Sequence, residues 1–384
     1  ICQGIWKNDI FEYHGEFADF PPCGFGAKPV QKPHPPIYFS GLKDPKRSAE
    51  RVAKYGLSGW IGIQDTPREL WRIDPTSLEQ LQLSHTDGRV FDFAAAPDGE
   101  SVVFSVMNDQ NGTDFWQVGR DGSEPRVILA CGADLCSGAS WSADGTRIAY
   151  SREPSGLSPG APKGPPRVWT FSVADGQTAP LYQDTQIIGY SPAWSSDGTW
   201  LGMVDNSSSA IRLLRLSDQR ELLLETQQGT MGTFAPDGSR LIYTTLTFDD
   251  ATAPQPFTTV MSADLGPSGG LTPILGREYS LADYGTPAWS PDGQWIAINQ
   301  RTTDSGPSKQ VWRMRPDGGE ATALTNDAEN TYAGYHWSPW SDALVIQRFP
   351  LNKAYATPEI VLWSAVDGSI KLLAQNASLP EWLP

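Results

Sequence analysis

The residues able to do acid–base or nucleophilic chemistry are few and scattered. The histidines are His14, His34, His85 and His336. Nucleophilic catalysis by serine or cysteine needs a histidine base oriented by a carboxylate, and no such set is evident along the chain. We therefore expect no nucleophile elbow, no catalytic residue and no complete active site. His336, beside Trp337, is interpreted as a core or channel residue.

The four cysteines are Cys2, Cys23, Cys131 and Cys136. No Cys-x-x-Cys pair or histidine cluster accompanies them, so we expect no metal site. Cys131 and Cys136 stand five residues apart in a loop-like segment, which favours a small disulfide in an oxidising compartment. The alternative is two free loop thiols.

Five of the aspartates that directly precede a glycine invite a calcium hypothesis. The simpler interpretation is that each carboxylate accepts hydrogen bonds from the amides of its own turn, as aspartate commonly does. We favour this structural role. The residues are Asp98, Asp144, Asp197, Asp237 and Asp292.

These aspartates belong to a repeat. An apolar strand enters an Asp-Gly turn and a second strand leaves it, as in Trp141-Ser-Ala-Asp-Gly145 followed by Arg147-Ile-Ala-Tyr150. The second strand is apolar at nearly every position, which indicates that both of its faces are covered. A third and a short fourth strand follow. Blades packed face to face in a β-propeller have this arrangement. The units begin at Ala95, Trp141, Trp194, Phe234, Trp289 and Trp337.

Strands left over at the two ends of this region predict a further blade. Glu69–Ile73 and Leu78–Leu83 read as a third and a fourth strand, and Pro380–Leu383 reads as a first strand. Together they predict a composite blade that removes exposed sheet edges, with Trp60–Ile63 as a candidate second strand. We expect seven blades, with six or eight as alternatives.

The Trp-Ser-Pro-Asp-Gly sequences and the strands that follow them resemble the repeats of TolB and of the propeller domains of some prolyl peptidases. This resemblance covers residues 66–384 and implies an all-β, TolB-like β-propeller. It implies little about function, because one fold supports many activities.

Residues 1–65 differ from the rest. Their His14-Gly-Glu16, Pro-rich and Pro-Pro-Ile37 segments resemble the luciferase-like monooxygenases, which are flavin- or deazaflavin-dependent barrels. The residues predict one βαβ unit with a helix over 44–55. By the resemblance, Ser40 and Gly41 would contact the cofactor phosphate. A complete barrel needs eight strands and about 250 residues, so we interpret this segment as an incomplete fragment and expect no cofactor.

Charge and composition limit the partners. The net charge of −15 argues against nucleic acid as a partner. The chain has no run of 18 apolar residues, so we expect no membrane span. We expect a monomer. An extracytoplasmic or envelope location is favoured for the propeller, and a cytoplasmic one for the N-terminal fragment.

The loops between second and third strands are long and differ from blade to blade, whereas the other turns are short. In a meandering blade these loops share one face, and loops on a rigid scaffold often carry binding sites. We therefore expect a non-catalytic scaffold that binds a protein or a polar small molecule on this face. The alternatives are a luciferase-like oxidoreductase fragment and the gating domain of a peptidase. The loops are Met107–Thr113, Glu153–Pro166, Phe248–Pro256, Thr302–Ser308 and Phe349–Pro358.

Overall fold

The computed structural model describes residues 68–156, 162–248, 256–275, 283–301, 308–352 and 356–383, together with four short strands in the preceding part of the chain. The chain divides into two compact units, Ile1–Thr66 and Pro67–Pro384. Within the described ranges, no helix is long and apolar enough to cross a membrane.

The first unit contains two strand pairs. β1 (Ile10–Gly15) and β2 (Ala18–Gly24) pair antiparallel, and β3 (Tyr38–Ser40) and β4 (Gly59–Ile61) pair in parallel. The helix predicted over 44–55 lies outside the described residues. One prediction is corrected: Trp60 aligns with Phe39 of β3, so the structure does not use this segment as the second strand of a closing blade.

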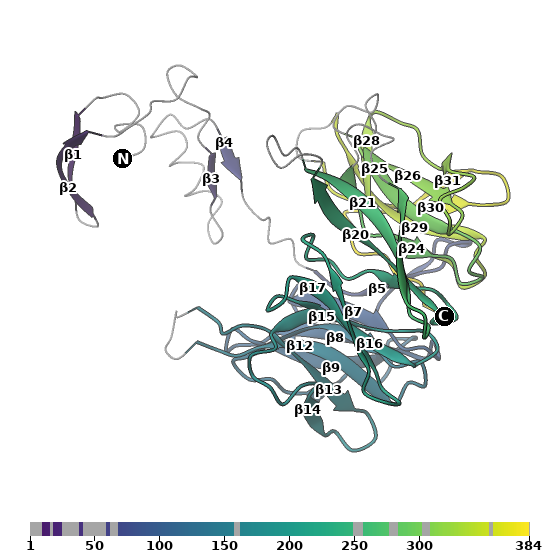
Figure 1. Cartoon of the computed structure of the whole chain (residues 1–384), viewed down its shortest axis with the longest axis horizontal. Helices are drawn as coiled ribbons and strands as arrows, with labels where there is room; N and C mark the ends of the chain where they lie inside the picture. The colour runs from purple at the N-terminus through teal and green to yellow at the C-terminus, as the bar shows by residue number, and fades with distance from the viewer. Residues whose placement is uncertain are drawn as a thin grey trace. The chain divides into compact units, whose positions relative to one another are not determined.

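The second unit is a β-propeller whose blades are six antiparallel sheets of four or five strands (Figure 1). In each sheet the strands follow one another in chain order, and in the fifth the inner strand is split into two pieces that pair with the same neighbour. The sheets are β7–β10 (Val90–Ala95, Ser101–Met107, Thr113–Gly119, Arg126–Leu129), β11–β14 (Leu135–Trp141, Arg147–Glu153, Arg167–Ser172, Thr178–Pro180), β15–β18 (Gly189–Trp194, Trp200–Asp205, Ala210–Arg215, Glu221–Glu225), β19–β22 (Thr233–Phe234, Arg240–Phe248, Pro256–Asp264, Gly270–Leu275), β23–β27 (Asp283–Tyr284, Ala288–Trp289, Ile296–Arg301, Gln310–Met314, Thr322–Ala323) and β28–β31 (Asn330–Trp337, Ala343–Pro350, Glu359–Ser364, Ile370–Gln375).

The count of seven blades predicted from the sequence is not supported. β5 (Trp71–Ile73) and β6 (Gln80–Gln82) form a sheet of only two strands, and residues 380–383 carry no strand. The reason is local: a β-ladder needs a strand between the first and third positions, and the described residues place none there.

The turns explain why the repeat folds into hairpins. In the five Asp-Gly turns between first and second strands, the aspartate Oδ1 accepts the amide two residues later at 3.0–3.1 Å. The following glycine has a positive φ, for example 68° at Gly145, which glycine adopts at little cost. The Ser142 hydroxyl also donates to Asp144, and these bonds lower the pKa of Asp144 to about 2. The predicted structural role of these aspartates is confirmed.

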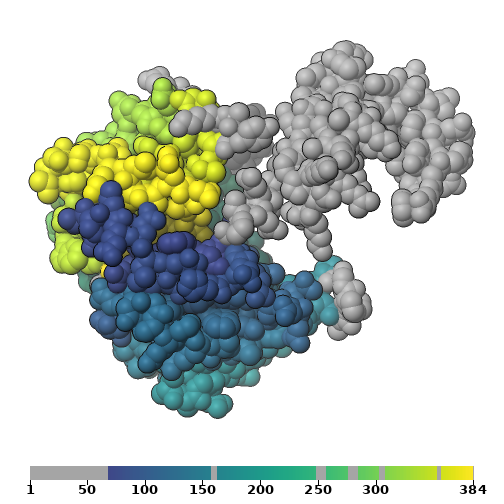
Figure 2. Space-filling view, turned by 180° about the vertical axis from the view of Figure 1, so that it is seen from behind, coloured from purple at the N-terminus to yellow at the C-terminus, as the bar shows by residue number. Residues whose placement is uncertain are grey.

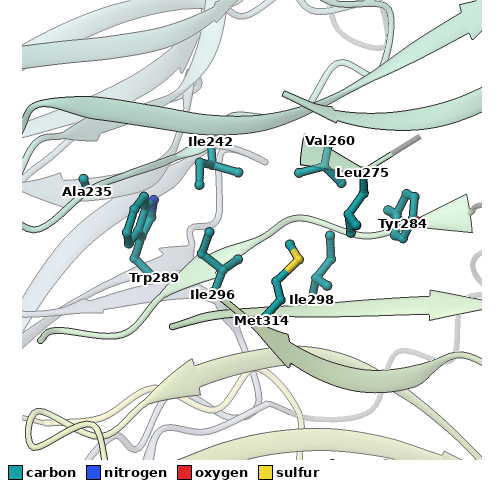
Figure 3. Close-up of a cluster of buried hydrophobic side chains, with 9 residues drawn as sticks. All are labelled: Ala235, Ile242, Val260, Leu275, Tyr284, Trp289, Ile296, Ile298 and Met314. Atoms are coloured by element: carbon teal, nitrogen blue, oxygen red, sulfur yellow. The ribbon is translucent and has the colours of Figure 1, made fainter. Parts of the chain in front are cut away.

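The core lies between neighbouring sheets. Each of the six second strands buries four consecutive residues, as in Ile296–Asn299. Figure 3 shows one such interface, where Ile242 and Val260 of the fourth sheet face Ile298 and Met314 of the fifth. Because alternate side chains of a strand point to opposite faces, a strand buried on both faces must contact a sheet on each side. Each blade is therefore packed between the blades that precede and follow it.

The two ends of the propeller unit meet. The indole Nε1 of Trp382 donates to the carbonyl of His336 at 3.0 Å, and Leu383 packs against a cluster containing Leu70 and Leu83. Lys371 Nζ reaches the carbonyl of Pro75 at 2.9 Å. Figure 2 shows the earliest coloured segment of the propeller lying against the most C-terminal one.

Trp382→Ala should destabilise the propeller by about 2 kcal/mol, because it removes both packing and an indole hydrogen bond. The measurement is the thermal midpoint of the full chain, followed by circular dichroism. Trp340→Ala is the matched control, since Trp340 is 75% exposed. Equal midpoints for the two variants would show that the C-terminal contacts do not hold the ends together.

Candidate functional site

The innermost strands of the blades converge on one another. β7 contacts β11, β11 contacts β15, β19 contacts β24, and β24 contacts β28. Between the last three inner strands lies a cavity of about 590 Å³, here called the inner cavity. Its lining comprises Thr233, residues 285–289, Pro291, Asn299 and residues 333–337.

A hydroxyl at the wall of the inner cavity fixes three chain segments. The Tyr335 hydroxyl donates to the carbonyl of Thr286 at 2.6 Å and accepts the amide of Asn299 at 2.9 Å. Burial raises the pKa of Tyr335, so the hydroxyl keeps its proton and remains a donor. Asn299 Nδ2 donates to the carbonyl of Tyr332 at 2.8 Å. These bonds join the fifth and sixth sheets and hold the wall in place.

Two polar atoms of the lining residues have no hydrogen-bond partner among the described residues. They are an acceptor, Asn299 Oδ1, and a donor, Trp289 Nε1, and both atoms are buried. Leaving a buried polar atom unpaired costs about 1–3 kcal/mol. A Cβ on Gly285 would lie 1.9 Å from Asn299 Oδ1, so a side chain at that position would displace the amide. Both atoms therefore belong to the packed wall of the inner cavity, not to its open surface.

His336, on β28, adds an imidazole to the lining. Its side chain is open to solvent although protein surrounds it, as expected for a residue that faces a cavity. Burial lowers the pKa of His336, so the ring is neutral at pH 7 and offers one donor and one acceptor. The channel position predicted for this histidine agrees with the structure, and its chemistry there is hydrogen bonding.

Glu381 contributes a carboxylate next to the innermost strands. The amide of Ala95 donates to it, yet burial dominates and raises the pKa of Glu381 to about 7. Solvent still reaches the side chain.

The structure joins Cys131 and Cys136 in a disulfide, with Cα atoms 6.4 Å apart. Thr113 fixes the second cysteine, because its hydroxyl accepts the amide of Cys136 at 2.7 Å. The bridge lies where the first sheet passes to the second. It forms no part of the inner cavity.

The other residues singled out from the sequence do not gather into a site. Ser40 ends β3, and Gly41 and His34 lie outside the described residues. His14 is in β1, and His85 is an exposed residue of the propeller.

The sequence expectation of no nucleophile elbow requires one correction. The pattern Gly-x-Ser-x-Gly occurs twice, at 156–160 and 266–270. Most of the first copy lies outside the described residues. The second copy lies where β21 passes to its antiparallel neighbour β22. A nucleophile elbow joins a strand to a helix, so the second copy does not have that geometry.

Sequence reasoning missed Asn299, Tyr335 and Glu381. One signal was available: Asn299 directly follows the apolar stretch Trp295–Ile298. A buried amide needs partners, and its presence marks a place where the chain departs from simple packing. Nothing in the sequence pattern pointed to Tyr335 or Glu381.

No family model matches the chain. It is similar in structure to a prolyl endopeptidase (TM-score 0.59, 16% identity, 80% of this chain and 46% of that chain) and to the β-propeller domain of the Trilobed protease from Pyrococcus furiosus (TM-score 0.55, 13% identity, 75% and 85%). It is also similar to a putative TolB from Agrobacterium tumefaciens (TM-score 0.48, 21% identity, 65% and 84%). At these identities the likeness shows the fold alone. The predicted β-propeller is confirmed.

A separate likeness covers a short stretch. Over 63 residues the chain is 33% identical to an FMNH(2)-dependent dimethylsulfone monooxygenase of Pseudomonas putida. The stretch is 16% of this chain and 17% of that protein. It agrees with the luciferase-like resemblance of the N-terminal residues.

The raised pKa of Glu381 should appear in the pH dependence of stability. An unfolded glutamate titrates near 4.3, so between pH 4.5 and 7 the folded state binds more protons and stability falls as pH rises. Above pH 7 this contribution is constant. Glu381→Gln should flatten the decline in urea midpoint between pH 4.5 and 7.5. Glu79→Gln, at an exposed position, should leave this decline unchanged. Identical pH profiles for the two variants would refute the assignment.

Proposed function

We propose that the propeller unit is a non-catalytic binding module whose inner cavity takes a peptide or another polar ligand. The observation that carries this proposal is the inner cavity itself, whose lining includes the solvent-exposed imidazole of His336. A peptide group presents both a donor and an acceptor, which is the complement of the donor and the acceptor of a neutral imidazole. The cavity volume of about 590 Å³ is within the usual range for ligand sites.

Charge favours a cationic or neutral ligand. The chain carries a net charge of −15, and a field of one sign steers oppositely charged molecules toward the protein. The imidazole of His336 is neutral at pH 7, so it adds no repulsion toward a cation. A basic peptide therefore fits both the long-range field and the local hydrogen-bonding groups.

The face that carries the long loops is the second location for binding. Most of these loops lie wholly or partly outside the described residues, including Asp249, Asp250 and Asp304. The proposal for this face rests on the sequence: the loops vary between blades and carry acidic residues. The alternative is that the long loops are insertions without a function, which are tolerated because lengthening a surface loop costs little free energy.

A peptide array incubated with the full chain supplies the ligand, and variants then locate the site. Asn299→Ala, which removes a hydrogen bond that holds the cavity wall, and His336→Ala, which removes the exposed imidazole, should each weaken binding about tenfold. His85→Ala should have no effect. The measurement is the Kd by fluorescence anisotropy.

If both cavity variants bind as tightly as the parent chain while shortening of the long loops abolishes binding, the ligand sits on the long-loop face. Mass spectrometry of the bound peptide adds a second readout. An intact peptide agrees with a binding module, and cleavage would contradict it.

A second candidate function is the gating domain of a peptidase. Its support is the likeness to a prolyl endopeptidase, of which this chain spans 46%. In this reading the inner strands surround the path of a peptide, and the hydrolytic residues lie outside the propeller. The peptide chemistry of the inner cavity is common to both candidates.

A third candidate concerns the N-terminal unit, where Ser40 and Gly41 would contact a flavin phosphate by the resemblance to luciferase-like monooxygenases. An isolated strand pair cannot build the phosphate site of an eight-stranded barrel. The full chain, incubated with FMN and then desalted, should therefore retain no stoichiometric flavin by fluorescence. Retention that Ser40→Ala abolishes would establish a flavin site instead.

A further inference from the structure

The β5–β6 pair has the hydrogen bonds of the third and fourth strands of a blade. The amide of Leu70 donates to Ser84 Oγ at 2.7 Å, as the amide of Val311 donates to Thr325 Oγ1 at 2.9 Å. Two further backbone bonds match in the same way, Leu83 to Leu70 with Leu324 to Val311, and Val90 to Arg68 with Tyr332 to Lys309. Three independent bonds place β5 and β6 at the third and fourth positions of a blade.

Residues 380–383 occupy the first-strand position of the same blade. In complete blades the indole of a first-strand tryptophan donates to a carbonyl of the preceding blade, from Trp141 to Ala94 and from Trp337 to Ala288. Trp382 repeats this contact with His336. In all three pairs, the acceptor directly precedes the position that matches the donor tryptophan in the preceding repeat.

Between these elements the second-strand position is empty among the described residues. β5 pairs only with β6, so the edge that meets a second strand in other blades is open. Trp71 is 50% exposed, whereas Trp116, Trp169 and Trp312 in other third strands are half-buried. Each of those three lies opposite a second-strand residue. An open edge beside an exposed tryptophan is a template for strand pairing.

The six filled positions define what fits the empty one. Each holds an uncharged stretch of four buried residues that begins with an aliphatic side chain and has a bulky third residue. The stretches are Val102–Ser105, Ile148–Ser151, Leu201–Val204, Leu241–Thr244, Ile296–Asn299 and Leu344–Gln347.

We propose that this incomplete seventh blade is an acceptor for an extended, uncharged apolar strand of a partner protein, which enters between residues 380–383 and β5. Main-chain hydrogen bonds supply affinity in strand addition, and side-chain pockets supply selectivity. We commit to a separate protein as the partner because, among the described residues, the segment with a similar pattern, around Trp60, is already paired as β4 with β3. The acceptor is distinct from the inner cavity and does not depend on the function proposed for it.

The test uses the full chain and a fluorescein-labelled peptide with the sequence of residues 294–301, which includes the second strand of the fifth blade. The peptide should bind and should raise the thermal midpoint with its concentration, because a ligand of the folded state alone stabilises it. A peptide with aspartate in place of both isoleucines should bind at least about tenfold more weakly. A peptide N-methylated at alternate residues should also fail, since strand pairing needs its amides.

Two exposed tryptophans provide the matched protein variants. Trp71→Asp, on the open edge, should weaken peptide binding at least about tenfold, and Trp340→Asp should leave it unchanged. Equal binding by the N-methylated peptide would overturn strand addition. Binding that appears only after Ile61→Asp and Ile63→Asp are introduced would overturn the assignment to a separate partner protein. It would mean that in the parent chain a segment of this chain already fills the acceptor.

Discussion

Burial of both faces of the second strands is the constraint on which this structure depends. A strand such as Ile296–Asn299 exposes apolar side chains on two sides, and one neighbouring sheet can cover only one of them. Each sheet therefore needs another on each side. A row of sheets leaves two uncovered ends, and only a ring leaves none. The contacts of Trp382, Leu383 and Lys371 bring the two ends together.

The same constraint separates the parts that hold the fold from the parts free to bind. The Asp-Gly turns are closed by their own side chains, as Asp144 illustrates through Ser142 and Thr146, so they have little capacity left for a ligand. The inner strands differ, because they converge without filling the space between them. Tyr335 and Asn299 keep that space open with a polar wall. The proposed binding site consequently lies among the inner strands.

Where the two ends of the propeller unit meet, complete strand pairing would favour stability, whereas an open edge favours recognition of a partner. A ring closed by complete blades has no free edge, whereas here β5 has a strand on only one side among the described residues, and Trp71 is half exposed. Natural sheets usually cover or charge such edges. The hydrogen bonds of Leu70 and Leu83 hold this edge in register, so the edge would need little further ordering when a partner strand binds. The inner cavity and the open edge are thus two separate surfaces of one scaffold.

The sequence by itself determined the propeller, its turns and the meeting of its ends, because these depend on local chemistry. Aspartate bonds its own turn, glycine takes a positive φ, and a continuous apolar strand needs cover on both faces. Tertiary structure decided the number of complete blades and the composition of the inner cavity. Asn299, Trp289 and His336 come from separate strands, and no spacing along the chain shows which of their polar atoms are left unpaired. The partner of Trp60 is likewise a long-range choice, because its apolar pattern suits β3 as well as a blade.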